Sequence, residues 1–81
     1  MGEFFNSKRD VPEKLGNVSP LVLVRLSERK QVESFYSHKN NLWYSTGFCL
    51  ESGERRRLSL DEEKEIVERM NKNAVLWKYW S

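Results

Sequence analysis

The chain has 81 residues, of which 38% are hydrophobic and 32% are charged, a composition typical of one small globular domain. A core of this size contributes only about 3–5 kcal/mol of stability, which is too little to offset the cost of a buried catalytic cavity. The net charge of +2 excludes a histone-like polycation. The charge is uneven, because residues 1–60 carry ten bases and seven acids, whereas residues 61–81 carry four bases and five acids.

Cysteine and histidine are scarce. Cys49 is the only cysteine, so it cannot form an internal disulfide, and one cysteine with one histidine does not supply a structural zinc site. A reducing compartment is expected, and we predict a cytoplasmic protein. Residues 1–20 contain no apolar run typical of a secretory signal, and the longest apolar run, Leu21–Val24, is too short to cross a membrane. We therefore expect no cofactor, no metal and no membrane.

The first 20 residues are polar and are interrupted by two glycines and two prolines. They predict a partly ordered N-terminal arm (residues 1–20), which precedes a single α+β domain (residues 21–81). Leu21–Ser27 is a continuous run of aliphatic residues, which predicts a well-covered strand. The polar segment Ser27–Lys30 then predicts a turn.

Gln31–His38 and Leu42–Leu50 predict a β-hairpin with Asn40-Asn41 as a two-residue turn. This pairing sorts the side chains onto two faces. One face is predicted to be buried and holds Phe35, Leu42, Tyr44, Phe48 and Leu50, with Glu33 and Thr46 at its margin. The other is predicted to be exposed and holds Val32, Ser34, Tyr36, His38, Trp43, Ser45, Gly47 and Cys49.

Glu51-Ser52-Gly53 fits a three-residue hairpin loop, with Gly53 in the left-handed conformation. The strand after this loop then directs Leu58 toward the core. In the same register Arg55 and Arg57 lie on the exposed face, beside Gly47 and Cys49.

The sequence Ser59-Leu60-Asp61-Glu62 is a capping box, in which Ser59 caps a helix and Glu62 reaches back to it. The helix carries an apolar stripe that we expect to cover the buried face of the sheet. Asn73 is a plausible left-handed stop. The β-rich segment 74–80 either continues the helix or forms a last strand, and the Asn71-Lys72-Asn73 break favours the strand.

The predicted fold is α+β: a small antiparallel β-sheet of three to five strands, with one capped α-helix packed on one face. The predicted core consists of Val22, Val24, Leu26, Phe35, Tyr44, Phe48, Leu50, Leu58, Ile66, Val67 and Met70.

An enzyme is not expected. His38 and Cys49 are the only pair of the nucleophile–base type. The predicted register pairs Cys49 with Val32, which lies six residues from His38 on the same strand, about 20 Å away. A dyad requires about 3 Å. The acids of the helix are interpreted as a solvated face, and no phosphate loop, zinc motif or nucleophile elbow is present in the sequence.

Two binding functions remain. For nucleic acid, the predicted exposed face offers Tyr36, His38 and Trp43 for stacking and Arg55 and Arg57 for phosphates or base edges. Three antiparallel strands followed by a helix can place the strands in the major groove of DNA. In this order of elements the chain resembles the small arm-binding domains of tyrosine integrases.

The preferred hypothesis from the sequence is a non-catalytic, regulatory protein–protein interaction, with an adaptor, inhibitor or subunit as the examples. Tryptophan, tyrosine and arginine are enriched at interface hot spots. Trp77 and Trp80 lie in the C-terminal segment, where a strand can pair with a partner or with a second copy of the chain. Nucleic-acid binding is the alternative.

Overall fold

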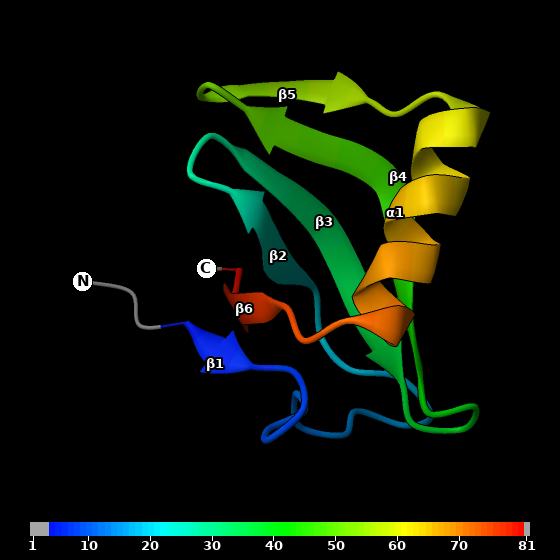
Figure 1. The fold of residues 1–81 in the computed structure, drawn as a ribbon. Helices are drawn as coiled ribbons and strands as arrows, with labels where there is room; N and C mark the ends of the chain where they lie inside the picture. Colours follow the sequence, from blue (N-terminus) through cyan, green and yellow to red (C-terminus); the bar gives the residue numbers. More distant parts are fainter. Residues whose placement is uncertain (1–3, 81) are drawn as a thin grey trace.

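The structure is a computed structural model that describes residues 4–80. In this range the chain forms one antiparallel sheet in the order β1-β6-β2-β3-β4-β5, and one helix crosses a face of that sheet (Figure 1). The elements are β1 (Phe5–Asn6), β2 (Val22–Ser27), β3 (Lys30–Ser37), β4 (Leu42–Glu51), β5 (Glu54–Arg57), α1 (Leu60–Lys72) and β6 (Leu76–Tyr79). The predicted α+β class is confirmed. The sheet has six strands rather than three to five, because the N-terminal segment adds β1.

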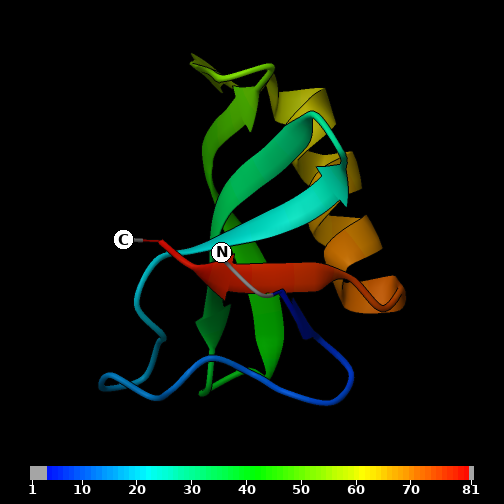
Figure 2. The same cartoon turned by 90° about the vertical axis from the view of Figure 1, so that its left-hand side faces the viewer.

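The segment before β2 is packed against the sheet. β1 pairs with β6, and the Ser7 N–H donates to the Val75 carbonyl oxygen at 2.8 Å. The Trp77 indole N–H donates to the Asp10 carbonyl oxygen at 2.9 Å, and Pro12 is fully buried. Figure 2 shows this segment running below the sheet, beside the turn between β3 and β4. Residues 1–3 of the predicted arm, and Ser81 of the predicted domain, lie outside the described residues.

We call the face of the sheet beneath α1 the inner face, and the opposite face the outer face. Ile66 and Met70 of α1 are buried against the inner face. Segment 7–19 covers the part of this face near β6 and the β3–β4 turn, so the helix and this segment together enclose the core. The inner-face side chains in that core are Val22, Val24, Val32, Tyr36, Trp43, Cys49 and Trp77.

The β3–β4 hairpin has a longer loop than predicted. Ser37 pairs with Leu42, so four residues form the turn, and only Asn41 has a positive φ, of 58°. Val32 pairs with Cys49, as predicted, but Ser34 pairs with Ser45. β4 thus gains two residues at a bulge around Gly47, whose φ is 96°. Two extra residues leave the alternation of faces unchanged.

The β4–β5 hairpin has a shorter loop than predicted. Glu51 pairs with Glu54, and the turn consists of Ser52 and Gly53, with φ values of 52° and 86°. Positive φ at both positions is the pattern of a two-residue type I′ turn. The difference of one residue reverses the faces of β5, so Arg55 pairs with Leu50 and Arg57 pairs with Phe48.

The hairpin side chains were sorted correctly into two sets, but the prediction of which set is buried was wrong. The helix covers the set with Val32, Tyr36, Trp43 and Cys49. Four predicted core residues, Phe35, Tyr44, Phe48 and Leu50, are only partly buried and lie on the outer face. The remaining predicted core is confirmed: Val22, Val24, Leu58, Ile66 and Met70 are buried, and Leu26 and Val67 pack against them.

The helix ends and the last strand follow local signals. The Ser59 side chain accepts from the Glu62 N–H, and the Glu62 carboxylate accepts from the Ser59 N–H, so the predicted capping box is confirmed. The C-cap is Asn73, whose N–H donates to the Arg69 carbonyl oxygen at 3.0 Å. Its φ of −113° is extended, so the predicted left-handed stop is wrong. Segment 74–80 contains the strand β6, as favoured.

Candidate functional site

The outer face carries an excess of positive charge. Its basic side chains are Arg25, Arg55, Arg57 and Lys78, and its acidic side chain is Glu33, which is buried. The register places these residues on adjacent strands, since Leu23 pairs with both Glu33 and Lys78. No helix covers this face in the described part of the chain (Figure 1). The outer face is therefore an open basic surface.

Phe48 is the centre of an arginine cluster. The Arg55 guanidinium carbon lies 3.9 Å from the Phe48 ring centroid, and that of Arg57 lies 5.1 Å from it. A second aromatic residue, Phe4, has Arg25 and Lys78 over its ring at 5.5 and 5.3 Å. Such cation–π contacts hold the charged groups in place while leaving their hydrogen-bond donors free.

Glu33 orients Arg55. Its carboxylate accepts from the Thr46 hydroxyl at 3.0 Å and from the Arg55 Nε–H at 3.3 Å. The Arg55 side chain remains 51% exposed. Because a guanidinium has five N–H donors, the Nη groups of Arg55 stay available for a ligand.

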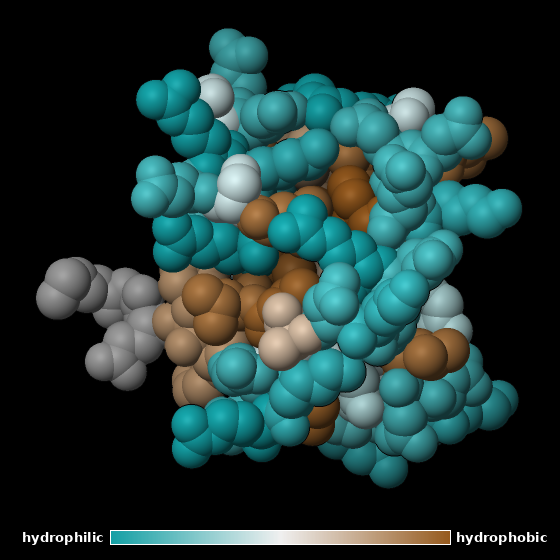
Figure 3. All heavy atoms as spheres, viewed as in Figure 1, coloured by the Kyte–Doolittle hydropathy of each residue, from teal (hydrophilic) through white to brown (hydrophobic). Residues whose placement is uncertain are grey.

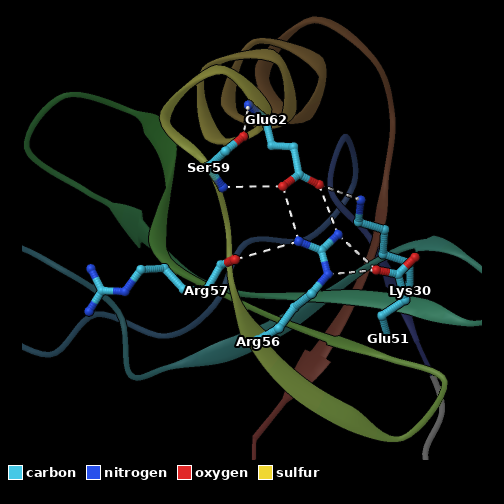
Figure 4. Close-up of polar contacts among 6 residues, drawn as sticks. All are labelled: Lys30, Glu51, Arg56, Arg57, Ser59 and Glu62. Carbon is cyan, nitrogen blue, oxygen red and sulfur yellow. Dashed lines mark hydrogen bonds and ion pairs between the residues drawn. The ribbon is translucent and has the colours of Figure 1, made fainter.

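Arg56 is held differently from its two neighbours. It lies on the inner face, where its guanidinium donates to the Glu62 carboxylate at 2.8 and 3.0 Å and to Glu51 at 2.8 Å (Figure 4). Lys30 adds a 3.4 Å contact to Glu62. The hydrogen bonds from Arg56 hold the pKa of Glu62 well below its usual range, and the same pair raises the pKa of Arg56. Figure 4 shows the Arg57 side chain extending away from this cluster.

We divide the outer face into two halves. The cationic half contains Arg25, Arg55, Arg57 and Lys78 with Phe48. The aromatic half lies nearer the β3–β4 turn and contains Leu21, Phe35, Leu42, Tyr44 and Trp80. Phe35 and Tyr44 are a cross-strand pair whose near-parallel rings have centroids 5.7 Å apart. Leu21, Leu42 and Trp80 are 45%, 41% and 38% exposed.

The predicted site residues separate into two groups. Tyr36, Trp43 and Trp77 are buried, with exposed fractions of 9%, 4% and 1%. Tyr36 and Trp43 were expected to offer stacking surfaces and Trp77 to contact a partner, and none of the three reaches the surface in the fold. Arg55, Arg57 and Trp80 are exposed on the outer face. The fold therefore brings the two arginines together with other aromatic residues than those we expected.

His38 and Cys49 do not form a pair. The His38 Nε2 atom lies 2.9 Å from the Pro12 carbonyl oxygen, which can only accept, so Nε2 carries the proton. This contact anchors segment 7–19. Cys49 is 1% exposed and lies in the core.

The aromatic residues that sequence reasoning missed are Phe35, Tyr44 and Phe48, since all three were placed in the core. One signal for the correct face is charge. With the observed β4–β5 register, the face of Phe48 also carries Arg55 and Arg57, and a helix over that face would bury them. Arg25 and Lys78 alternate with Val24 and Trp77, which fits the same assignment.

The helix side carries an excess of acids, because α1 has five acidic and three basic side chains. A groove between α1 and the end of β2 is lined by the apolar side chains of Leu26 and Ile66 and by three acids and two bases, namely Glu62, Glu65, Glu68, Lys30 and Arg69. Figure 3 shows hydrophobic atoms at the bottom of this hollow, between hydrophilic ridges. Residues 4–80 hold no group of three or more side chains that could bind a metal ion. The described helix is not long and apolar enough to span a membrane.

Comparison with family models, with curated proteins and with solved structures gives no match for this chain. Its function therefore has to be argued from its own residues.

Proposed function

We propose that the chain is a non-catalytic binding domain that binds nucleic acid through its outer face. The cationic half contacts phosphates, and these contacts supply most of the affinity. The observation that supports the proposal best is the segregation of charge between the outer face of the sheet and the helix on its other side.

On the outer face, four basic side chains accompany one buried carboxylate, and that carboxylate is already bonded to Arg55 and Thr46. On the other side, α1 carries five acids, Asp61, Glu62, Glu63, Glu65 and Glu68, against the bases Lys64, Arg69 and Lys72. A polyanion is therefore attracted to one face and repelled from the other, although the net charge is only +2.

Availability of the charges supports the same ligand. Arg56 is neutralised by Glu51 and Glu62, whereas Arg57 is exposed and turned away from those acids. Arg55 is half exposed and is held in position by Phe48 and Glu33. Guanidinium groups fixed in this way lose little conformational freedom when they bind phosphate.

A protein partner, including a second copy of the chain, is the second candidate. Leu21, Leu42 and Trp80 are exposed large hydrophobic residues on the outer face, which is a feature of protein interfaces. Pairing along the sheet edges is less well supported. One edge is β5, a four-residue strand of charged side chains, and the other is the two-residue β1.

The test is the binding of the purified chain to fluorescein-labelled DNA and RNA pools, measured by fluorescence anisotropy at low and at moderate salt. We expect affinity that falls steeply with salt. The double variant Arg55→Ala/Arg57→Ala should lose most of this affinity and should lower the slope of log K against log salt by about 1.4 for a single strand.

The matched control is Lys64→Ala/Lys72→Ala, which removes the same charge from the helix side, where both side chains are exposed. It should bind as the unaltered chain does. An equal loss in both double variants would show that net charge alone is responsible. If no binding is detected at low salt, the proposal is wrong, and sedimentation equilibrium of the chain then tests the second copy.

A further inference from the structure

We infer that the nucleic acid bound by the outer face is single-stranded, with its unpaired bases on the aromatic half and its phosphates on the cationic half. This inference rests on the proposed function and narrows it to one class of ligand. It depends on how the two halves lie relative to each other.

The aromatic half forms a row across the strands. Tyr44 on β4 pairs with Phe35 on β3, and the Trp80 N–H donates to the Leu21 carbonyl oxygen at 3.3 Å, next to β2 and β6. Adjacent strands are about 4.8 Å apart, so the row extends about 14 Å from β4 to β6. That length accommodates about two or three bases in a row, as in other sheets that stack bases.

The cationic half is parallel to this row. Lys78 lies two residues from Trp80 in an extended segment, which separates their positions by about 7 Å. At the other side of the sheet, Arg57 lies beside Phe48, four residues along β4 from Tyr44. A ligand that lies across the strands therefore meets apolar rings along one side and positive charges along the other.

A single strand can place its bases on one side and its phosphates on the other, whereas a duplex cannot. In a duplex the flat faces of the bases are stacked on one another, and only their edges are accessible in the grooves. In a single strand the bases can turn out of the stack onto aromatic rings or guanidinium planes. The Arg55 guanidinium, 3.9 Å from the Phe48 centroid, offers a further flat surface of this kind.

The exposed and partly exposed apolar side chains of the outer face are available to a ligand. The outer face directs Leu21, Leu42 and Trp80 into solvent beside four cations, and a protein partner would need acidic groups and apolar side chains in the same alternation. A single strand has phosphates and bases in that alternation along its whole length. Charge complementarity therefore favours nucleic acid as the occupant of both halves.

The test compares three labelled 12-nucleotide probes in anisotropy: a mixed-sequence single strand, the same sequence as a duplex, and a strand of abasic residues with the same phosphates. We expect the single strand to bind about tenfold more tightly than either of the others. The variant Phe35→Leu/Tyr44→Leu, which keeps apolar side chains on the strands, should abolish this preference, so that the three probes bind with about equal affinity.

Phe5→Leu is the matched control. Phe5 is a 41% exposed aromatic residue on the inner face, where it contacts Trp77, so its loss should leave the preference unchanged. Equal binding of all three probes, lost only in Arg55→Ala/Arg57→Ala, would overturn this inference and leave the proposed function in place. Absence of binding to all three at low salt would overturn both.

Base stacking has a second readout in tryptophan fluorescence. Trp43 and Trp77 are buried, so a base on the outer face quenches Trp80. We expect quenching by the single strand and none by the abasic strand. Quenching that persists in Trp80→Phe would contradict the placement of the bases.

Discussion

The two faces of this sheet use similar residues for different purposes. Both carry aromatic side chains on β3 and β4, but those of the inner face lie beneath α1 and segment 7–19, whereas those of the outer face share an uncovered surface with basic side chains. Trp77 and Trp80 show the contrast within one segment: the first is 1% exposed and the second 38% exposed. An aromatic residue in a small domain can therefore be assigned to a ligand surface only when the residues that surround it in the fold are known.

The largest effect is expected from removing an inner-face ring. Trp77→Ala should lower the free energy of unfolding by about 3–5 kcal/mol, because Trp77 contacts Phe5, Trp43 and Tyr79 and is fully buried. A core of this size supplies little more than that, so the variant should be largely unfolded in urea titrations at 25 °C. Trp80→Ala is the matched variant and should cost about 1 kcal/mol or less. Equal losses in the two variants would contradict the assignment of the faces.

The next effect is the stabilisation by the ion pair between Arg56 and Glu62, which depends on pH. Since the folded-state pKa of Glu62 is lowered, its carboxylate stabilises the fold above the ordinary glutamate pKa of about 4.5. That stabilisation is lost progressively as the pH falls below this value. Glu62→Gln should therefore lower the Tm at pH 7 and should lower it less at pH 3, where part of the stabilisation is already lost. The control Glu65→Gln lies on the exposed side of α1 and should change the Tm little at either pH.

A smaller effect is expected at the helix cap. Ser59→Ala removes the acceptor for the Glu62 N–H and should cost about 1 kcal/mol. For a domain of this size the Tm should fall by about 4–8 °C in thermal unfolding followed by circular dichroism. Ser59→Asp retains an acceptor and should restore most of the loss. No change in Ser59→Ala would mean that the capping box contributes nothing to stability.

The smallest effect on stability is expected from the outer face. Arg57→Ala removes an exposed cation–π contact with Phe48, and the free energy of unfolding should fall by about 0.5 kcal/mol. Nucleic-acid affinity should fall severalfold in the same variant. A variant that loses stability but not affinity would show that Arg57 serves the fold alone.

Local signals in the sequence predicted much of this fold. The capping box at Ser59, the strand character of segment 74–80 and the alternation of side chains along the β3–β4 hairpin all depend on neighbouring residues, and all three are present in the structure. The choice of buried face was wrong because both faces of that hairpin carry apolar residues. A simple two-residue turn at Glu28-Arg29 would pair Val24 with Glu33, which lies on the same face of the sheet as Phe35. That pairing would also have supported the wrong choice of buried face.

The structure reverses that pairing through a bulge in β2. Between Arg25 and Ser27 the register shifts by one residue, so Val24 pairs with Val32 and both lie beneath the helix. A shift of one residue moves every side chain to the other face, whereas the two-residue shift near Gly47 moves none. The bulge in β2 carries no glycine or proline, so the sequence offers no local signal for it.

The candidate site was predicted only in part, because its residues also depend on the registers of the strands. Arg55 and Arg57 were assigned to the uncovered face although both the β5 register and the buried face were predicted wrongly, because the two errors compensate. The aromatic residues of the site were not predicted, since Phe48, Phe35 and Tyr44 reach the surface only if α1 covers the other face. The ion pairs of Arg56 were not predicted, because its acidic partners Glu51 and Glu62 are brought to it by the turn and the helix.

The sequence by itself determined the class of the fold, the helix and its cap, the strands other than β1, and the division of the hairpin strands into two sets of side chains. These features depend on residue type and spacing over a few positions. Only the tertiary structure decided which set is buried, that residues 4–20 close the core, and that four basic side chains share one open face. Those outcomes depend on registers and bulges between strands, where a change of one residue alters the faces without altering the local pattern.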